Sequence, residues 1–208
     1  MKDITVEVRG RAKINLALHV IGVKADGYHV LDSIVIFTDI SDSLFIKKSK
    51  ENRLTFTGEF SKSLNVKKNS ILQALKLFEN VLTDRFSIKL EKKLPIGAGL
   101  GGGSADAAAI IRFITSHCSH PMPSPRAISK IGADVPACVL SKASRVGGIG
   151  ELVRPIDISG IDLWIVLVNP RIFVSTASIF QEVIEKNNEP LEPFNHFSSS
   201  NQFIDYLE

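Results

Sequence analysis

A run of glycines between Pro95 and Ser104 is the feature of this chain with the clearest chemistry. From Gly97 to Ser104 it reads Gly-Ala-Gly-Leu-Gly-Gly-Gly-Ser. Glycine adopts positive φ and lets the backbone come close to a ligand. A helix that starts directly behind such a loop offers unpaired N–H groups and the positive end of its dipole to an anion. The run therefore predicts a loop that cradles phosphate groups.

The residues around the loop indicate a strand before it and a helix after it. Phe86, Ile88 and Leu90 alternate with polar residues, as in a strand with one wet face. The alanine-rich segment from Asp106 to about Thr115 is typical of a helix. A wet face favours an antiparallel or mixed sheet with helices on one side, and so an α+β protein.

Three other kinds of glycine-rich segment compete with this interpretation. A Walker A loop ends in Gly-Lys-Ser or Gly-Lys-Thr, whereas this loop ends in Gly103-Ser104-Ala105. A Rossmann loop follows a continuously apolar parallel strand, and an acid about 20 residues further on holds the ribose; neither feature is found. A flexible linker rarely stands between a strand and an alanine-rich helix. The phosphate cradle is the interpretation that remains.

Periodicity predicts the other elements of the first 150 residues. Large apolar side chains recur at every second position, which predicts a strand that carries Lys13 and Asn15 on one face; they are Ile14, Leu16, Leu18 and Val20, with Lys13, Asn15, Ala17 and His19 between them. Between residues 70 and 82 the apolar residues recur at three and four, as in an amphipathic helix with Asn69 or Ser70 as its N-cap.

A second unit is expected to begin near residue 150, which gives domains of residues 1–150 and 151–208. In the second unit Leu163–Val168 is predicted to be an apolar strand and Ser178–Ile184 a helix.

Composition and charge exclude several classes of function. The chain of 208 residues has 25 Lys and Arg against 22 Asp and Glu, a net charge of +3 that is too small to indicate a nucleic-acid-binding protein. Two cysteines do not make a disulfide scaffold. No signal peptide and no apolar run of about 20 residues is found. The expectation is a cytoplasmic protein that handles small anions, does not bind membranes, and has an oligomeric state that the sequence leaves open.

Five segments together resemble a known family. Pro95–Ser104 resembles the phosphate-loop motif of the GHMP kinases. Three segments, Ala12–Leu16, Ala25–His29 and Gly132–Pro136, are similar to those of the 4-diphosphocytidyl-2-C-methyl-D-erythritol kinases within that superfamily, as is Val174–Ala177 followed by Phe180. Each match alone is weak, but they occur in the right order and cover most of the chain.

The resemblance implies both a fold and a function. The fold would have a domain like ribosomal protein S5 domain 2 at the amino terminus and a ferredoxin-like domain at the carboxy terminus. The function would be ATP-dependent phosphorylation of the 2-hydroxyl of 4-diphosphocytidyl-2-C-methyl-D-erythritol, in the non-mevalonate route to isoprenoid precursors. The small-molecule substrate and ATP are the expected partners. Mg²⁺ is expected with ATP, but its protein ligands are unknown; Asp106 is one possibility and equally serves as a first-turn acid on the helix dipole.

The resemblance also assigns the catalytic pair. Phosphoryl transfer to an alcohol benefits from a carboxylate that accepts the hydroxyl proton, and Asp134 occupies the family position of that base. Lys13 would provide an ammonium that steadies the developing alkoxide. We therefore expect Lys13 and Asp134 to meet within hydrogen-bond reach. The alternative for Asp134 is an N-cap of a helix that begins at Val135-Pro136.

The remaining site residues divide between the two ligands. Tyr28, His29 and Phe180 would hold the cytosine, with His29 bonding its ring edge. Asn15 and Thr176 would contact the erythritol or diphosphate. The residues expected around ATP are Pro95, Gly97, Gly99, Leu100, Gly101, Gly102, Gly103 and Ser104, with Asn69 and Lys93 near the adenosine.

Two departures from the family pattern are visible. The family has two serines after the glycines, whereas this chain has Ser104-Ala105, so one hydroxyl contact is missing or replaced. The third glycine-rich motif of the superfamily is also missing after Glu151, which leaves the expected carboxy-terminal domain incomplete. The alternative function is a catalytically inactive nucleotide-binding module.

Overall fold

The computed structural model describes residues 4–67, 69–170, 172, 174–194 and 197–208. Its strands are β1 (Val6–Val23), β2 (His29–Ser49), β3 (Arg53–Thr57), β4 (Arg85–Glu91), β5 (Ser144–Gly148) and β6 (Leu152–Pro155). Its helices are α1 (Ser70–Lys76), α2 (Gly102–His117), α3 (Pro125–Ser129), α4 (Val135–Leu140), α5 (Thr176–Glu182) and α6 (Ser200–Leu207).

The long strand β2 organises a single mixed sheet. It runs antiparallel to β1 along nearly its whole length, and its other edge pairs with β5 at Leu31–Val35 and with β4 at Ser43–Ser49. Strand β3 joins β4 in parallel and β6 joins β5 antiparallel. The mixed sheet with its helices confirms the α+β prediction. The strand predicted around Ile14 is part of a longer strand, β1, which has register shifts such as that between Arg11 and Lys13.

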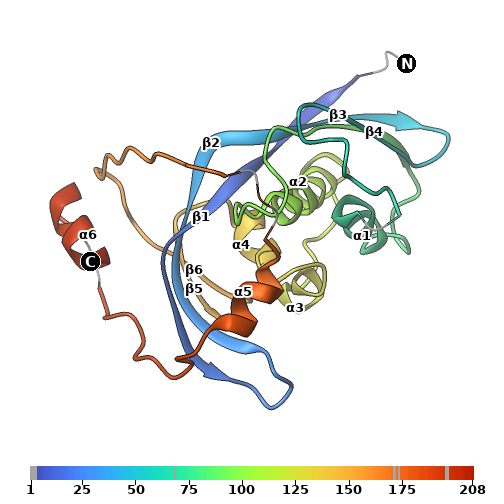
Figure 1. Cartoon of the computed structure of the whole chain (residues 1–208). Helices are drawn as coiled ribbons and strands as arrows, with labels where there is room; N and C mark the ends of the chain where they lie inside the picture. Colours follow the sequence, from blue (N-terminus) through green and yellow to red (C-terminus); the bar gives the residue numbers. More distant parts are fainter. Residues whose placement is uncertain (1–3, 68, 171, 173, 195–196) are drawn as a thin grey trace.

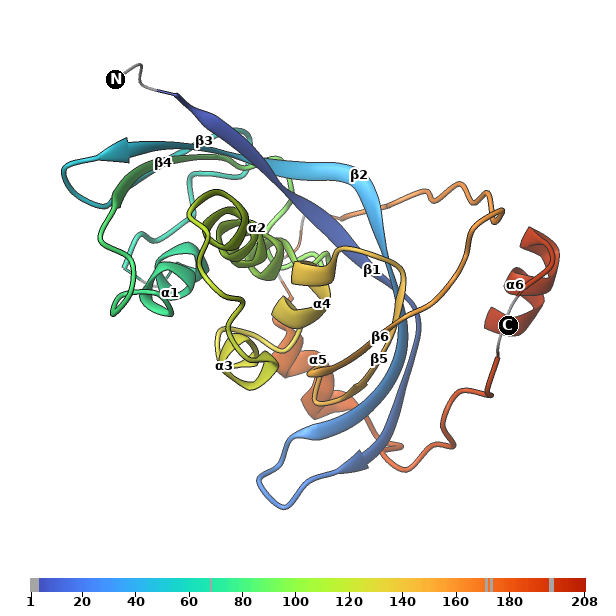
Figure 2. The same cartoon turned by 180° about the vertical axis from the view of Figure 1, so that it is seen from behind.

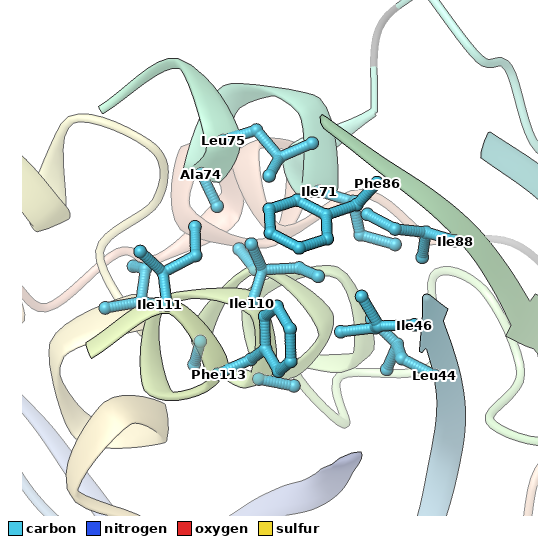
Figure 3. Packing of buried hydrophobic residues seen from close by; sticks show 14 of the residues in the cluster. Leu44, Ile46, Ile71, Ala74, Leu75, Phe86, Ile88, Ile110, Ile111 and Phe113 are labelled. Carbon is cyan, nitrogen blue, oxygen red and sulfur yellow. The ribbon is translucent and has the colours of Figure 1, made fainter. Parts of the chain in front are cut away.

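Helices α1 to α4 lie on one face of the strongly curved sheet (Figure 1). Seen from behind, helix α6 lies on the opposite side of β1 and β2 (Figure 2). Helix α2 fits closely against the sheet because its first turns carry small side chains, with Ala105, Ala107, Ala108 and Ala109 all buried. Figure 3 shows Ile110 and Phe113 of α2 among side chains of the sheet and of α1. Burial of each such large side chain contributes about 1.5–3 kcal/mol, so this core fixes where α2 begins.

Helix α1 begins as predicted but ends early. The side chain of Asn69 caps it by accepting the N–H of Ile71 at 2.9 Å. The helix ends at Lys76 and the chain continues in turns, although Phe78 and Leu82 are still buried against the core. The apolar spacing shows that these residues are buried, but a chain in turns can bury them as well as a helix can.

The strand predicted at Leu163–Val168 is wrong. The described residues from 156 to 170 contain no strand, and the side chains of Trp164, Val166 and Val168 are 99%, 86% and 88% exposed. A strand needs a neighbouring strand that bonds to its N–H and C=O groups, and among the described residues no strand pairs with this segment. Within the described part of the chain, no helix is long and apolar enough to span a membrane.

The segment after α5 is anchored to the outer face of the sheet. Arg145 of β5 donates two hydrogen bonds to the carboxylate of Asp32 on β2, at 2.8 and 2.5 Å. The same pair binds both backbone groups of Leu191, and Phe203 of α6 packs nearby against Ile34. The expected domain boundary near residue 150 lies in the turn between β5 and β6, so β6 continues the main sheet. The division into two domains stays a prediction.

Candidate active site

The predicted phosphate loop connects β4 to α2, as expected from the alternation before it. Gly97, Gly99 and Gly101 have positive φ, and Gly101, at φ 64°, is the N-cap of α2. The first helical hydrogen bond to Gly101 comes from the N–H of Ala105 at 2.8 Å. The N–H groups at the start of α2 therefore have no partner within the helix and are available to an anion.

The loop forms a wall of a cavity of about 530 Å³. Every residue from Pro95 to Ser104 lines it, together with Asn69, Lys92, Asp106 and Asp134. The hydroxyl of Ser70 donates to the carbonyl of Gly103 at 2.6 Å and so ties the loop to α1. A cavity of this size and lining can hold the phosphates of a nucleotide.

The two residues expected near the adenosine differ in their placement. Asn69 lines the cavity, but its side-chain oxygen is used to cap α1. The ammonium of Lys93 lies on the exposed side, 3.0 Å from Glu91, and this residue does not line the cavity. The structure brings Asn69 to the loop and does not bring Lys93 there.

Lys13 and Asp134 meet beside the loop. The ammonium of Lys13 lies 3.0 Å from Oδ1 of Asp134 and 2.6 Å from Oδ1 of Asn15. The side chain of Lys13 is 5% exposed and that of Asp134 is 41% exposed, so the ammonium is buried while the carboxylate faces the cavity. The backbone N–H of Lys13 donates to the carbonyl of Leu100 at 3.0 Å, which joins β1 to the loop. The expected contact is therefore present.

Asp134 has the position of a helix cap but does not act as one through its side chain. Asp134 stands at the N-cap position of α4, directly before Val135 and Pro136. Its side chain makes no capping hydrogen bond, and its carboxylate lies against Lys13 instead. The turn into α4 thus presents an acid to the cavity, where it can accept a proton.

The aromatic residues predicted to bind cytosine come from two distant parts of the chain. The ring of His29, at the start of β2, stacks on the ring of Phe180 in α5, with centroids 5.1 Å apart. Nε2 of His29 is buried and has no hydrogen-bond partner. Tyr28 directly precedes His29 in sequence and is 60% exposed. The side chain of Thr176 lies outside the described part of the structure.

Comparisons with known proteins agree with this arrangement. Residues 69–147 match the family model described as the GHMP kinases N terminal domain. The chain is 40% identical over 193 residues to a 4-diphosphocytidyl-2-C-methyl-D-erythritol kinase of Ruegeria pomeroyi, and the match covers 91% of this chain and 67% of that protein. It is 38% identical over 185 residues to the protein of the same name from Cereibacter sphaeroides, covering 89% of this chain and 66% of the relative.

The chain belongs to the 4-diphosphocytidyl-2-C-methyl-D-erythritol kinase family, within the GHMP kinases. It spans about two thirds of the length of the curated relatives that it matches. A crystal structure of 4-(cytidine 5'-diphospho)-2C-methyl-D-erythritol kinase superposes with a TM-score of 0.60 at 30% identity, covering 73% of this chain and 55% of that one. The GHMP kinase fold expected from the motifs is confirmed.

This family member carries a buried charge cluster that sequence reasoning missed. The ammonium of Lys92 donates to Oδ2 of Asp42 and, at 2.9 Å, to Oδ2 of Asp106. The side chain of Lys92 is only 2% exposed, which is rare for a lysine. One signal was present in the sequence: the alternation of Phe86, Ile88 and Leu90 continues to position 92 and places it on the buried face.

The pKa values in this cluster follow from burial and charge. Burial raises the pKa of Asp106 to about 7, against the opposing effect of Lys92. Burial alone would lower the pKa of Lys92, but the charges of Asp106 and Asp42 raise it. Lys92 holds Oδ2 of Asp106, and Asp106 lies beyond the first turn of α2, so it is not a first-turn acid. A role of Asp106 as a magnesium ligand stays a prediction. The described residues contain no group of three or more acidic, histidine or cysteine side chains that could hold a metal ion.

Ala105 replaces the second serine of the family motif. It is buried in the first turns of α2, where its methyl group packs in the core. The hydroxyl of Ser104 remains at the cavity. Of the two hydroxyl positions expected in the family, this chain keeps the one that lines the cavity.

Proposed function

We propose that this chain acts as a kinase that transfers the γ-phosphoryl group of ATP to the 2-hydroxyl of 4-diphosphocytidyl-2-C-methyl-D-erythritol. The observation that carries the proposal is the Lys13–Asp134 contact at 3.0 Å, in the cavity that the phosphate loop lines. Phosphoryl transfer to an alcohol is helped by a base that accepts the hydroxyl proton, by a positive charge near the attacking oxygen, and by a loop that binds the phosphates. The names of the relatives suggest the substrate.

The chemical step assigns a role to each member of the pair. The substrate hydroxyl oxygen attacks the γ-phosphorus, a new O–P bond forms, and the bond from that phosphorus to the β–γ bridging oxygen breaks as ADP leaves. Asp134 accepts the hydroxyl proton. The ammonium of Lys13 steadies the negative charge that develops on the attacking oxygen. Asn15 holds this ammonium in place through its side-chain oxygen at 2.6 Å.

The phosphate loop would bind the triphosphate through backbone N–H groups at the start of α2 and through the hydroxyl of Ser104. Mg²⁺ commonly reaches such sites on the phosphates themselves and keeps several water ligands. The chain therefore does not need a carboxylate cage for it. Bound Mg²⁺ would neutralise phosphate charge, while Lys13 and Asp134 act on the hydroxyl.

Recognition of the cytosine would come from Tyr28, His29 and Phe180. Aromatic rings stack on a base at about 1–3 kcal/mol per base. The unpartnered Nε2 of His29 is a buried polar atom that a ring-edge group of the base could satisfy. Together these residues would select a cytidine diphosphate-linked alcohol, whose phosphorylated product would enter isoprenoid precursor synthesis.

An assay of ADP release tests the proposal. The purified chain is incubated with ATP, Mg²⁺ and 4-diphosphocytidyl-2-C-methyl-D-erythritol, beside an Asp134→Asn variant of equal fold and thermal stability. We expect substrate-dependent ADP release that falls by about 10²–10⁴-fold in the variant. If the wild-type chain binds ATP without substrate-dependent ADP release, the proposal fails, and the chain is a nucleotide-binding module. Mevalonate and homoserine serve as control substrates and should give no release.

A further inference from the structure

Three charged side chains that the proposed mechanism does not use are buried directly behind the phosphate loop. Lys92 follows the last residue of β4, Asp42 lies in β2, and Asp106 lies in α2. All three are at most 3% exposed. Buried charges are rare unless they are paired and hydrogen-bonded, and here one ammonium serves two carboxylates.

The cluster joins the two ends of the loop. Oδ1 of Asp42 accepts the backbone N–H groups of Lys93 and Leu94, at 2.6 and 2.9 Å, where the chain enters the loop. Asp106 belongs to the helix that leaves the loop. Because the ammonium of Lys92 bonds to both aspartates, the entry and the exit of the loop are fixed relative to each other.

The cluster also lies close enough to the phosphate site to act on it by charge. A Cβ atom on Gly102 would lie 2.9 Å from the ammonium of Lys92, so the loop backbone touches the cluster. Lys92 and Asp106 both line the cavity that the loop encloses. Over such short distances, charges interact strongly at the effective dielectric of a protein surface.

We propose that Lys92, held by Asp42 and Asp106, is a positioning residue that keeps the phosphate loop in its binding shape and sets the affinity of the cavity for the phosphates of ATP. This inference rests on the proposed function, since it assumes that a nucleotide occupies the loop. The net charge of the cluster determines whether it favours or opposes the binding of phosphate groups in the cavity. With both aspartates ionised the cluster carries one net negative charge, which opposes phosphate binding; with one aspartate protonated it is neutral.

Asp106 is the member that changes charge near neutral pH. Its Oδ1 is buried without a hydrogen-bond partner, and burial raises its pKa to about 7. The charged groups that face it are Lys92 and Asp42. Cys138 of α4 is also within electrostatic reach, but burial raises the pKa of that thiol to about 12, so it stays neutral. ATP affinity should therefore weaken as the pH rises through about 7.

Direct binding measurements test the inference without requiring turnover. Calorimetry gives the Kd of ATP in the presence of Mg²⁺, and the Kd of CDP as a probe of the base site, for the wild-type chain and three variants. Lys92→Met removes the ammonium. Asp106→Asn keeps the Lys92–Asp42 pair but fixes the cluster as neutral. Lys48→Met is the matched control, because Lys48 forms a surface ion pair with Asp84 on the same sheet.

We expect Lys92→Met to raise the Kd of ATP on the order of tenfold and to leave the Kd of CDP unchanged. Asp106→Asn should bind ATP on the order of tenfold more tightly than the wild type at about pH 8.5, and equally at about pH 5.5. Lys48→Met should match the wild type. If Lys92→Met does not fold, the pH dependence of ATP binding by Asp106→Asn tests the inference on its own.

Three results would overturn the inference. They are an unchanged ATP affinity in folded Lys92→Met, an equal loss of ATP and CDP binding in that variant, and parallel pH profiles for Asp106→Asn and the wild type. A wild-type chain that binds no ATP would instead contradict the proposed function itself. The two failures are therefore distinguishable.

Discussion

The ring of His29 stacks directly on the ring of Phe180, with their planes 25° apart. This contact joins the start of β2 to helix α5, which lie 151 positions apart in the chain. Two rings in contact cannot hold a third ring between them. A cytosine bound by these residues would therefore stack on the other face of Phe180, or on Tyr28, with His29 packed behind Phe180.

Phe180→Ala is expected to weaken binding of the cytidine half of the substrate. The loss of one stacking ring should raise the Kd of CDP by a factor of roughly 5 to 150, which corresponds to about 1–3 kcal/mol. The Kd of ATP should not change. Titration of CDP measures the effect, and Ile179→Ala is the control because this neighbour on α5 is 53% exposed. Equal CDP affinity in the two variants would remove Phe180 from the base site.

Asn15→Ala is expected to lower kcat without a matching change in the Kd of ATP. Asn15 accepts a hydrogen bond from the ammonium of Lys13 at 2.6 Å and so fixes its direction toward Asp134. A loosened ammonium stabilises the transition state less well, which should reduce kcat on the order of tenfold. Lys13→Met should cost more, about 10²–10³-fold. A loss in Asn15→Ala as large as that in Lys13→Met would mean that Asn15 itself acts on the substrate.

Local patterns predicted the elements that surround the phosphate loop. The alternation of Phe86, Ile88 and Leu90 specified β4, and the glycines followed by alanines specified where α2 begins. The family motifs brought Lys13 and Asp134 together although they are far apart in sequence. In each of these cases the information lies in a short stretch of chain or in a recognisable motif.

What the sequence could not predict depends on partners that are distant in the chain. Lys92 can be buried because it forms ion pairs with Asp42 and Asp106. The residues next to Lys92 in sequence do not reveal that these two distant carboxylates will lie beside it. The segment Leu163–Val168 has the composition of a strand, but a strand also needs a neighbour that takes up its backbone hydrogen bonds. Composition alone cannot supply that neighbour.

Gly101→Ala is expected to weaken ATP binding more than its backbone strain alone explains. Gly101 has φ 64°, a conformation that costs other residues about 1–2 kcal/mol. An added Cβ would also be in van der Waals contact with the side chain of Lys13, 3.4 Å from its Cβ and 3.5 Å from its Cε, so a backbone shift that relieves the strain would move the Lys13–Asp134 pair. Gly160→Ala is the control, because Gly160 has φ 85° and open space around its Cβ position.

Both glycine variants should lose similar stability in thermal unfolding, whereas only Gly101→Ala should raise the KM for ATP and lower kcat. If Gly160→Ala had the same kinetic defect, the effect would come from general strain. The proposed link between Gly101 and the Lys13–Asp134 pair would then be wrong.

Asp32→Asn is expected to destabilise the protein in a pH-dependent way. Burial alone would raise the pKa of Asp32, but the hydrogen bonds and charge of Arg145 and the N–H of Leu191 together lower it. The folded state then binds fewer protons at Asp32 than the unfolded state does. The stabilisation is therefore present above the unfolded pKa of about 3.9 and is lost as the pH falls through the lower folded value.

Urea unfolding between about pH 3 and pH 7 measures this dependence. Near pH 7 the variant should lose about 1–3 kcal/mol, the usual contribution of hydrogen bonds to a charged group, and the difference from the wild type should shrink toward pH 3. Asp39→Asn is the control, since Asp39 forms an exposed ion pair with Arg11 at 3.2 Å, and this variant should change stability little. A difference between Asp32→Asn and the wild type that stays constant across this range would show that the carboxylate of Asp32 contributes no charge-dependent stability, and that Arg145 holds Leu191 without it.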